Sequence, residues 1–248
     1  MKFTIITVVK NDEKNISKTI DSVISQNLNG FEYIIIDGFS SDNTKSIIEQ
    51  YNDPRIKFFS INDNSVYEAL NYGIKKSIGE YIVMMHSGDL FYDEDVLYQI
   101  DKVIQNSEII TSNCFYYKND KKKIFRKWIK PFKKLHKLNS YKVAHTTTII
   151  KKSIFFEVGF YSEKFQISSD TEFILRLLFK NKKIVYHNLN SVLMKYGGKS
   201  TSLKYSLKKI KEDMQIYYQY FKYIFIFFYF LKIFSKLLDF VNIKKFTK

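Results

Sequence analysis

The stretch Tyr81–Asp89 reads YIVMM followed directly by HSGD, an apolar run that ends in a tight polar turn with a single acidic residue, Asp89. Two further polar turns follow apolar runs earlier in the chain, at 37–42 (DGFSSD) and 62–65 (NDNS). Ligands of open α/β sheets bind in the crevice outside the carboxyl ends of the strands, so three such turns can converge on one ligand. A carboxylate in that crevice can hold a divalent cation against a phosphate. This layout indicates a nucleotide-sugar site.

Strand-like and helix-like segments alternate through the first half of the chain. Short apolar, β-branched runs predict strands at 3–9, 31–36, 56–61, 81–85 and 109–115. Apolar residues at helical spacing separate these runs, as in Ile16, Ile20 and Val23. This alternation implies a mostly parallel sheet with right-handed crossovers. Later in the chain we expect strands at 146–151, 183–187 and 192–196, a short helix near Phe155 and a helix beginning near Ser168.

Composition limits the class of protein and its partners. The 248 residues carry a formal charge of +15, from 40 Lys and Arg against 25 Asp and Glu, which favours phosphates, nucleic acid or an anionic membrane surface as partners. The one cysteine, Cys114, cannot form an internal disulfide and indicates a reducing, cytoplasmic compartment. The sequence starts on a strand-like run and shows no pattern of a cleavable signal peptide.

Basic and aromatic residues concentrate in two segments. Residues 118–137 contain ten Lys or Arg and one Asp, and predict either a solvated loop with an edge strand or a basic flap over a phosphate or membrane. Residues 203–248 have a helical pattern rich in Phe, Tyr, Ile and Lys, typical of an amphipathic segment at a membrane surface or of a helix packed on the protein or on a second subunit. Between Lys222 and Lys232 lie only nine uncharged residues, whereas a membrane-spanning helix needs about 20. We predict a domain over 1–202 and a basic aromatic helical tail over 203–248.

Four motifs occur in a characteristic order and spacing: KNDE at 10–13, DGFSSDNT at 37–44, NSVYEALNYG at 64–73 and SGD at 87–89. Together they resemble the inverting family-2 glycosyltransferases of the GT-A fold that build bacterial surface polysaccharides. The resemblance covers roughly residues 3–202 and extends to Gly159–Phe165, Ser169-Asp170 and Gly197–Ser200. It implies an α/β fold of the GT-A type, with a mostly parallel central sheet flanked by helices.

The resemblance implies a nucleotide-binding role for Thr7 and Asp37, with Asp37 accepting a hydrogen bond from the uracil N3–H. A carboxylate is an acceptor only and suits an imide donor; the alternative is that Asp37 merely caps its own turn. Asp63 and Asn64 would contact ribose or diphosphate, or else cap the helix that follows.

The remaining donor-binding candidates are Asn11, Asn71, Ser87, Gly88 and Lys199. Asn71 resembles a family position, but a structural hydrogen bond explains it equally well. Lys199 belongs to a Gly-Gly-Lys-Ser loop at 197–200, which is either a simple turn or a loop that closes over the diphosphate.

Asp89 is the predicted metal ligand, for Mn²⁺ or Mg²⁺. Members of the resembling family usually carry Asp-x-Asp at this turn, and here Ser87 replaces the first Asp. One protein carboxylate, two diphosphate oxygens and waters can still complete an octahedral shell. His86, beside this turn, could face the pocket or serve the structure alone.

Inversion at the anomeric carbon requires a general base beside the acceptor hydroxyl. Asp170 matches the family position of that base, at the start of a predicted helix, and Glu172 is the alternate. The two residues lie about 200° apart on an ideal helix, so they are not expected to face one pocket. His145 resembles an acceptor-side position.

The implied reaction moves a hexose or N-acetylhexosamine from a UDP-sugar to a hydroxyl of a lipid-linked glycan, as in lipopolysaccharide O-antigen or capsule assembly at the inner face of the cytoplasmic membrane. Three alternatives remain. A sugar nucleotidyltransferase would carry a glycine-rich basic loop after the first strand, where this chain has Val8–Asp12 (VVKND). A nucleic-acid-binding protein would fit the charge but not an acidic crevice, and we expect no nucleic-acid partner. An inactive, membrane-associated partner of another transferase would fit Ser87.

Overall fold

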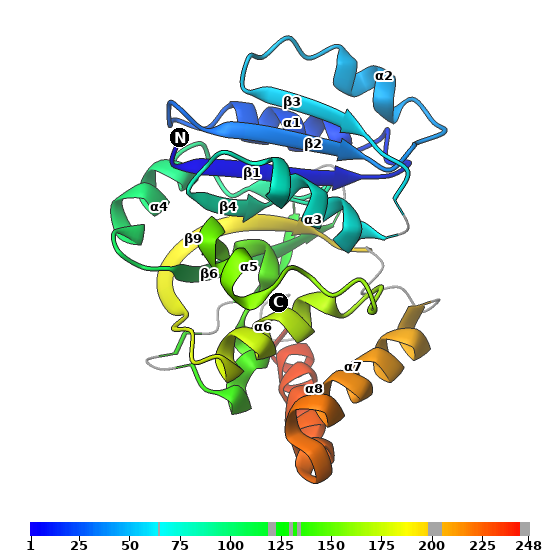
Figure 1. Cartoon of the computed structure of the whole chain (residues 1–248), viewed down its shortest axis with the longest axis vertical. Helices are drawn as coiled ribbons and strands as arrows, with labels where there is room; N and C mark the ends of the chain where they lie inside the picture. The colour runs from blue at the N-terminus through cyan, green and yellow to red at the C-terminus, as the bar shows by residue number, and fades with distance from the viewer. Residues whose placement is uncertain (64, 119–122, 129–130, 133–134, 198–204, 244–248) are drawn as a thin grey trace.

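A computed structural model describes residues 1–63, 65–118, 123–128, 131–132, 135–197 and 205–243. One nine-stranded sheet runs through the protein, with helices on both faces (Figure 1). The strands are β1 (Phe3–Val9), β2 (Glu32–Asp37), β3 (Ile56–Ser60), β4 (Tyr81–Met84), β5 (Leu90–Phe91), β6 (Ile109–Lys118), β7 (Lys123–Trp128), β8 (Ile149–Lys151) and β9 (Val185–Lys195). Their order is β3-β2-β1-β4-β8-β6-β9-β5, and β7 pairs with β6.

The first half of the sheet is parallel, as the strand–helix alternation predicts. β1 pairs with β2 and β4, and β2 with β3, all in parallel. In the second half, β8 is antiparallel to both β4 and β6, while β9 is parallel to β6. β5 and β7 add antiparallel pairs to β9 and β6. The α/β class with flanking helices is confirmed, and the later strands make the sheet mixed.

Two expected boundaries differ from the structure. The strand expected at 146–151 is shorter because a 3₁₀ turn, η2 (His145–Thr147), precedes it. The hydroxyls of Thr147 and Thr148 both donate to the carbonyl of Ala144, at 3.0 and 2.8 Å, and these bonds favour the turn. The segments 183–187 and 192–196 belong to the single long strand β9, whose pairing with β6 shifts register between Thr111 and Cys114.

Eight α-helices are described: α1 (Ile16–Ile24), α2 (Thr44–Glu49), α3 (Val66–Lys76), α4 (Val96–Ile104), α5 (Lys152–Val158), α6 (Ser169–Phe179), α7 (Ser206–Phe221) and α8 (Phe225–Ile243). Alternate residues of the buried strands face opposite layers. Ile6 and Ile34 pack with α3, α5 and α6, whereas Ile5 and Tyr33 pack with α1, α2 and α4. The two layers hold the strand ends, and the turns that follow them, at one edge.

Two local features position α3. The side chain of Ser65 caps its N-terminus by accepting from the backbone N–H of Glu68 at 3.1 Å. Gly73 allows the helix to approach the sheet, because a Cβ there would lie 2.8 Å from Ile36 Cδ1 and 2.9 Å from Ile6 Cγ2. Larger residues at this position would push α3 away from β1 and β2.

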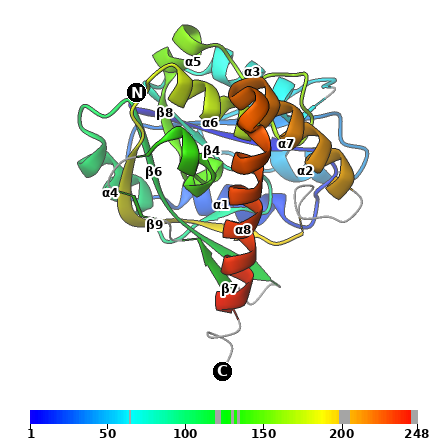
Figure 2. The same cartoon turned by 90° about the horizontal axis from the view of Figure 1, so that it is seen from below.

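The C-terminal helices α7 and α8 pair at the end of the molecule away from α2 and β3 (Figures 1 and 2). They share a third core cluster with α6, which contains Leu175, Ile216, Phe221 and Phe228. Within the described part of the chain, no helix is long and apolar enough to span a bilayer. The division at residue 202 stays a prediction, but the described part of the tail packs on the α6 side of the protein.

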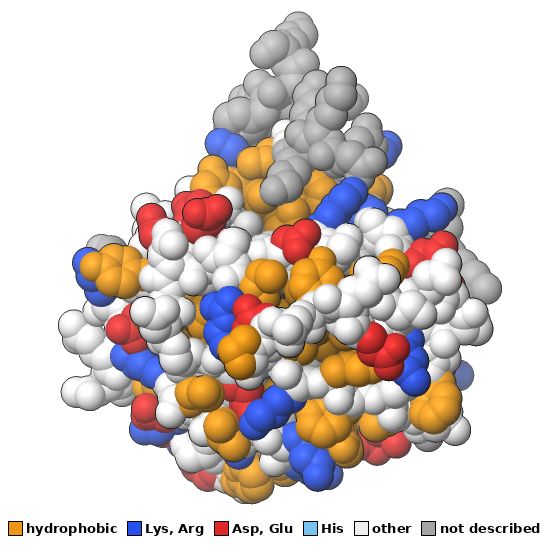
Figure 3. Space-filling view, turned by 90° about the horizontal axis from the view of Figure 1, so that it is seen from above, with side chains coloured by type: hydrophobic (Ala, Val, Ile, Leu, Met, Phe, Trp, Pro, Cys, Tyr) orange, Lys and Arg blue, Asp and Glu red, His pale blue; other side chains and the backbone are white. Residues whose placement is uncertain are grey.

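The excess positive charge does not collect on the face that Figure 3 shows. There, Lys and Arg side chains are interspersed with Asp and Glu and with apolar groups. In the basic segment 118–137, β7 forms the edge strand that one of the two interpretations predicted, and residues 119–122, 129–130 and 133–134 of that segment lie outside the described residues.

Candidate active site

The turn that follows β4 is held in place by α1 and β6. The backbone N–H of Asp89 donates to the carbonyl of His86 at 2.9 Å, and Gly88 adopts a φ of +91°, which favours glycine. Thr19 of α1 accepts from the Gly88 N–H at 2.9 Å, while the hydroxyl of Tyr117 on β6 donates to the Gly88 carbonyl at 2.6 Å. This turn is therefore a rigid platform.

Asp89 is buried in this turn, with 4% of its surface exposed. Its Oδ1 accepts from the backbone N–H of Lys195 at 3.0 Å, and burial raises its pKa to about 8. Ser87, at the position of the missing acidic residue, donates its hydroxyl to Asp12 Oδ2 at 2.7 Å. Among the described residues, no group of three or more His, Cys, Asp or Glu is placed to hold a metal ion. These residues fit a cation only through one carboxylate, with the remaining ligands coming from the donor and water.

Lys195 is a site residue that the sequence analysis missed. A Cβ on Gly88 would lie 3.3 Å from Lys195 Cδ, so the lysine stem lies against the turn. Its ammonium group donates to the side chain of Asn15, which in turn donates to Asp12. Lys195 is 106 residues from Asp89 in sequence. In the sequence, Lys195 was marked only by its place near the end of the strand predicted at 192–196.

The second turn brings Asp37 and Asp63 together, as predicted. Asp37 is fully buried, and its Oδ2 accepts from the Ser40 N–H at 3.0 Å and the Ser60 hydroxyl at 3.1 Å. Its Oδ1 is buried and has no hydrogen-bond partner among the described residues. A Cβ on Gly38 would lie 2.8 Å from Asp63 Oδ2, so the Asp63 carboxylate lies against this turn. An orphaned acceptor of this kind suits a ligand that brings an N–H donor.

Two residues near Asp37 have positive φ values. Asn11 and Phe39 have φ values of +54° and +53°, in the left-handed region that Asn tolerates but bulky residues such as Phe avoid. Asn11 Oδ1 accepts from the Ser41 N–H at 2.8 Å and so joins the loops after β1 and β2. Phe39 is 60% exposed beside the turn. Backbone strain of this kind concentrates at functional sites. Phe39 could not be identified from the sequence, because a single aromatic residue forms no motif that predicts a binding site.

Two predicted donor-binding side chains lie in the core instead. Thr7 is fully buried, and its hydroxyl shares a 3.0 Å hydrogen bond with Tyr33. Asn71 is 3% exposed, and its amide bonds to both the N–H and the carbonyl of Tyr161, at 3.0 and 2.9 Å. Both ends of the Asn71 amide are occupied, so its contacts are those of a structural hydrogen bond. Two further predicted donor contacts lie outside the described residues, Asn64 and Lys199.

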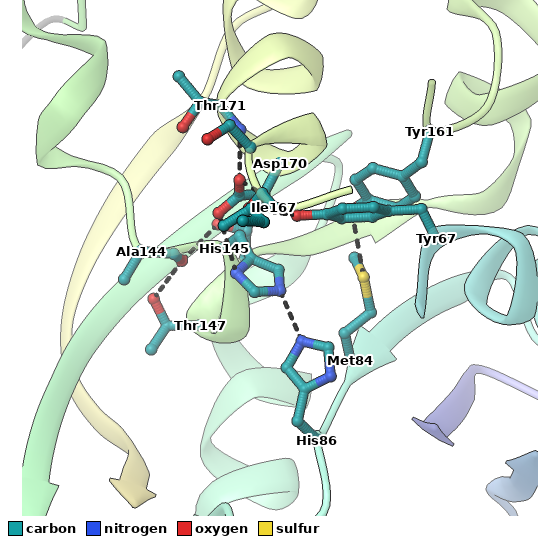
Figure 4. Close-up of polar contacts among 12 residues, drawn as sticks. Tyr67, Met84, His86, Ala144, His145, Thr147, Tyr161, Ile167, Asp170 and Thr171 are labelled. Atoms are coloured by element: carbon teal, nitrogen blue, oxygen red, sulfur yellow. Dashed lines mark hydrogen bonds and ion pairs between the residues drawn. The ribbon is translucent and has the colours of Figure 1, made fainter. Parts of the chain in front are cut away.

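Asp170 lies at the start of α6 and faces two histidines in line (Figure 4). His145 Nδ1 lies 3.5 Å from Asp170 Oδ2, and His145 Nε2 lies 2.8 Å from His86 Nε2. The other carboxylate oxygen accepts from the Thr171 N–H at 2.7 Å. The hydroxyl of Tyr67 is 3.5 Å from the same oxygen and donates to a nearby carbonyl at 2.9 Å. The structure thus brings the predicted base and the predicted acceptor-side residue into contact.

The pKa values of Asp170 and of both histidines lie below their ordinary values. Burial tends to raise the pKa of Asp170, but His145 in its protonated form, Lys209 and the Thr171 N–H outweigh this effect. Burial lowers the pKa of His145 and lowers that of His86 to about 3. An ionised carboxylate beside neutral imidazoles is suited to accept a proton.

Glu172 faces different partners, as its position on the helix predicts. Its carboxylate pairs with Arg176 at 2.6 Å and accepts from the Tyr220 hydroxyl at 2.6 Å. Its side chain is 6% exposed, compared with 27% for Asp170. These contacts tie α6 to α7, and Asp170 is the more accessible of the two candidate bases.

Glu212 of α7 is a second residue missed from sequence. Its carboxylate accepts from three successive backbone N–H groups, those of Gln166, Ile167 and Ser168, at 2.9 to 3.1 Å. These groups directly precede α6, so the C-terminal segment fixes the helix start that carries Asp170. A lone Glu in a lysine-rich segment gave no signal for this contact.

The sequence is similar to those of known glycosyltransferases. The sequence model described as Glycosyl transferase family 2 matches residues 4–164. An uncharacterised glycosyltransferase of Rickettsia typhi is 27% identical over 186 residues, which are 71% of this chain and 58% of the relative. A PGL/p-HBAD biosynthesis glycosyltransferase of Mycobacterium bovis is 24% identical over 81% of this chain and 80% of its own length. The chain thus spans less than two thirds of the Rickettsia relative.

Solved structures share the fold. TarS 1-349 of S. aureus, in complex with UDP-GlcNAc, superposes with a TM-score of 0.71 at 20% identity, over 88% of this chain and 66% of that one. The mannosyltransferase PcManGT from Pyrobaculum calidifontis, in complex with GDP-Man and Mn²⁺, gives a TM-score of 0.64 at 14% identity, over 88% and 63%. Both likenesses support the GT-A architecture expected from the sequence.

Proposed function

The chain belongs to glycosyl transferase family 2, and from this premise we propose that it transfers a hexose or N-acetylhexosamine from a UDP-sugar to a glycan hydroxyl, with inversion. One observation carries the proposal. His86 belongs to the turn that carries Asp89, and its ring contacts the ring of His145. The other side of the His145 ring faces Asp170 at the start of α6. A carboxylate for the leaving diphosphate and a base for the acceptor thus belong to one site.

Three features near the end of β2 support uridine as the donor base. Asp37 offers a buried acceptor oxygen, without a hydrogen-bond partner among the described residues, that fits the uracil N3–H. Phe39 presents an exposed ring beside it, on which a base can stack. Asp63 adds a carboxylate that can accept from ribose hydroxyls. TarS, which shares the fold, is solved with UDP-GlcNAc.

The proposed chemistry divides between the two carboxylates. Asp170 accepts the proton of the acceptor hydroxyl as its oxygen attacks the anomeric carbon from the face opposite UDP. Asp89 would hold Mn²⁺ or Mg²⁺, which when bound neutralises charge on the leaving diphosphate. Lys195 places an ammonium group beside the same turn and adds favourable electrostatics for an anionic group. PcManGT, with the same fold, is solved with Mn²⁺.

The donor assignment is tested by replacing Asp37 with Asn. The amide oxygen would take over the bonds to Ser40 and Ser60, so that the NH₂ group would face the uracil N3–H, another donor. We expect UDP to bind at least about tenfold more weakly, the cost of a buried unpaired donor. Calorimetry with UDP, GDP and Mn²⁺ measures this, and Asp101→Asn on α4 is the control. Tighter binding of GDP than UDP by the wild type, with no transfer from any of a panel of UDP-sugars, would contradict the proposal.

The acceptor is proposed to be lipid-linked, with the protein peripheral on the inner face of the cytoplasmic membrane. On α7, the side chains of Leu207, Ile210, Met214 and Tyr218 are exposed at helical spacing. On α8, Phe227, Phe230 and Phe234 are more than 60% exposed and follow the same kind of spacing. Aromatic stripes of this kind enter the headgroup region, and lysines near them favour anionic lipid.

Substituting Phe227, Phe230 and Phe234 together with Ser tests this membrane contact. We expect the variant to sediment with phosphatidylglycerol-containing liposomes much less than the wild type does, because the apolar anchor is lost. Phe156→Ser on α5 is the matched control, since that ring is also 60% exposed. Truncation after Ser202 would be a poor test, because it removes Glu212 from the start of α6. Equal sedimentation of the triple variant and the control would refute the anchor.

A further inference from the structure

A contact between two histidine rings joins the donor turn to the start of α6 (Figure 4). His86 follows β4 directly, and His145 lies in η2, 59 residues later. Their ring centroids are 5.0 Å apart, and their Nε2 atoms are separated by 2.8 Å. Packing alone does not require two imidazoles to meet nitrogen to nitrogen at hydrogen-bond distance.

For two neutral imidazoles, the contact has only one self-consistent arrangement of protons. At 2.8 Å, one Nε2 donates and the other accepts. His145 Nδ1 faces Asp170 Oδ2, and a carboxylate is an acceptor only, so the His145 proton belongs on Nδ1. A neutral imidazole carries one N–H, which leaves His145 Nε2 as the acceptor. His86 must then donate from Nε2.

We propose, on the basis of the proposed transfer reaction, that His86 and His145 form a directional hydrogen-bond chain that ends on Asp170 and fixes the orientation of its carboxylate. His86 and His145 act as positioning residues. His145 is not itself the base, because His86 occupies its Nε2. The 3.5 Å separation from Asp170 is long for a hydrogen bond, and such contacts tighten when the reactive complex forms.

The chain also couples the two halves of the site. The carbonyl of His86 accepts from the Asp89 N–H at 2.9 Å, so the same residue touches the donor turn with its backbone and the chain with its ring. The Thr171 N–H already occupies Asp170 Oδ1, which makes Oδ2 the oxygen that the chain positions. Loss of the chain should therefore lower kcat and leave the KM for the donor unchanged.

Amide substitutions separate this role from packing. The NH₂ group of Asn replaces a histidine Nδ1–H, and that of Gln replaces an Nε2–H. We expect His86→Gln, which keeps a donor to His145, to stay within a small factor of wild-type kcat. His145→Gln removes the donor to Asp170, and His145→Asn and His86→Asn both break the contact between the two rings. Each of these three variants should lose about 10–100-fold. His187→Asn and His187→Gln are the controls, because the His187 ring makes no hydrogen bond through its buried Nε2 among the described residues.

Nitrogen-15 NMR of histidine-labelled protein supplies a readout that is independent of turnover. We expect His145 as the Nδ1–H tautomer and His86 as the Nε2–H tautomer at neutral pH, with assignments from the single variants. An Nε2–H signal for His145, or equal loss of kcat in all four amide variants, would contradict the proposed hydrogen-bond chain. If the wild type transfers no sugar while both tautomers are as expected, the hydrogen-bond chain is supported and the proposed function is wrong.

Discussion

Asp170→Asn is expected to lower the rate of sugar transfer by about 10²–10⁴-fold, the usual loss when a general base is removed. Asn keeps the shape of the side chain and still accepts from the Thr171 N–H, so the start of α6 should keep its structure. Donor affinity should be unchanged, because Asp170 acts on the acceptor hydroxyl. Single-turnover transfer assays, together with calorimetry for UDP, measure both quantities.

Glu172→Gln is the matched control for this experiment. Glu172 is occupied by Arg176 and Tyr220, so its loss should lower the thermal stability more than the rate. Near-normal turnover in Asp170→Asn with a large loss in Glu172→Gln would move the base to Glu172. If neither change slows transfer, the displacement mechanism has no base at the start of this helix.

Asp89→Asn is expected to abolish detectable transfer and any stabilisation by Mn²⁺. The amide can still accept from the Lys195 N–H, so the turn should stay intact, but it cannot release a proton to bind a cation as the carboxyl group can. Thermal unfolding with and without Mn²⁺, measured alongside transfer, gives both readouts. Full activity of the variant, or full activity of the wild type in excess EDTA, would exclude the metal role.

The raised pKa of Asp89 also predicts a dependence of stability on pH. Because that pKa is about 8 in the folded protein and about 3.9 in an unfolded chain, the native state keeps a proton that the unfolded state releases. The contribution of Asp89 to the free energy of unfolding therefore falls as pH rises from about 4 to 8. This slope should be smaller in Asp89→Asn. Since metal binding displaces the proton, Mn²⁺ should raise the melting temperature of the wild type more at pH 8 than at pH 6.

Local sequence pattern was enough to predict the elements that carry the site. The apolar run before Asp89, the helical spacing after Ser65 and the small residue at Gly73 each have a local physical cause, and the structure confirms those elements. The same pattern could not place β8 antiparallel between β4 and β6, because strand direction depends on the path of the intervening chain. The family resemblance gave Thr7 a nucleotide-binding role, but its side chain is buried, as is β1 along its whole length.

The sequence by itself determined the α/β class and the order of the polar turns, because these depend on residues close together in the chain. Its resemblance to a known family pointed to the candidate acids Asp37, Asp89 and Asp170. Only the tertiary structure decided that His86 meets His145, that Lys195 lies against the donor turn and that Glu212 holds the start of α6. Each of these contacts joins residues separated by dozens of positions. Long-range contacts of this kind are fixed by how the layers pack on the sheet, which no local periodicity records.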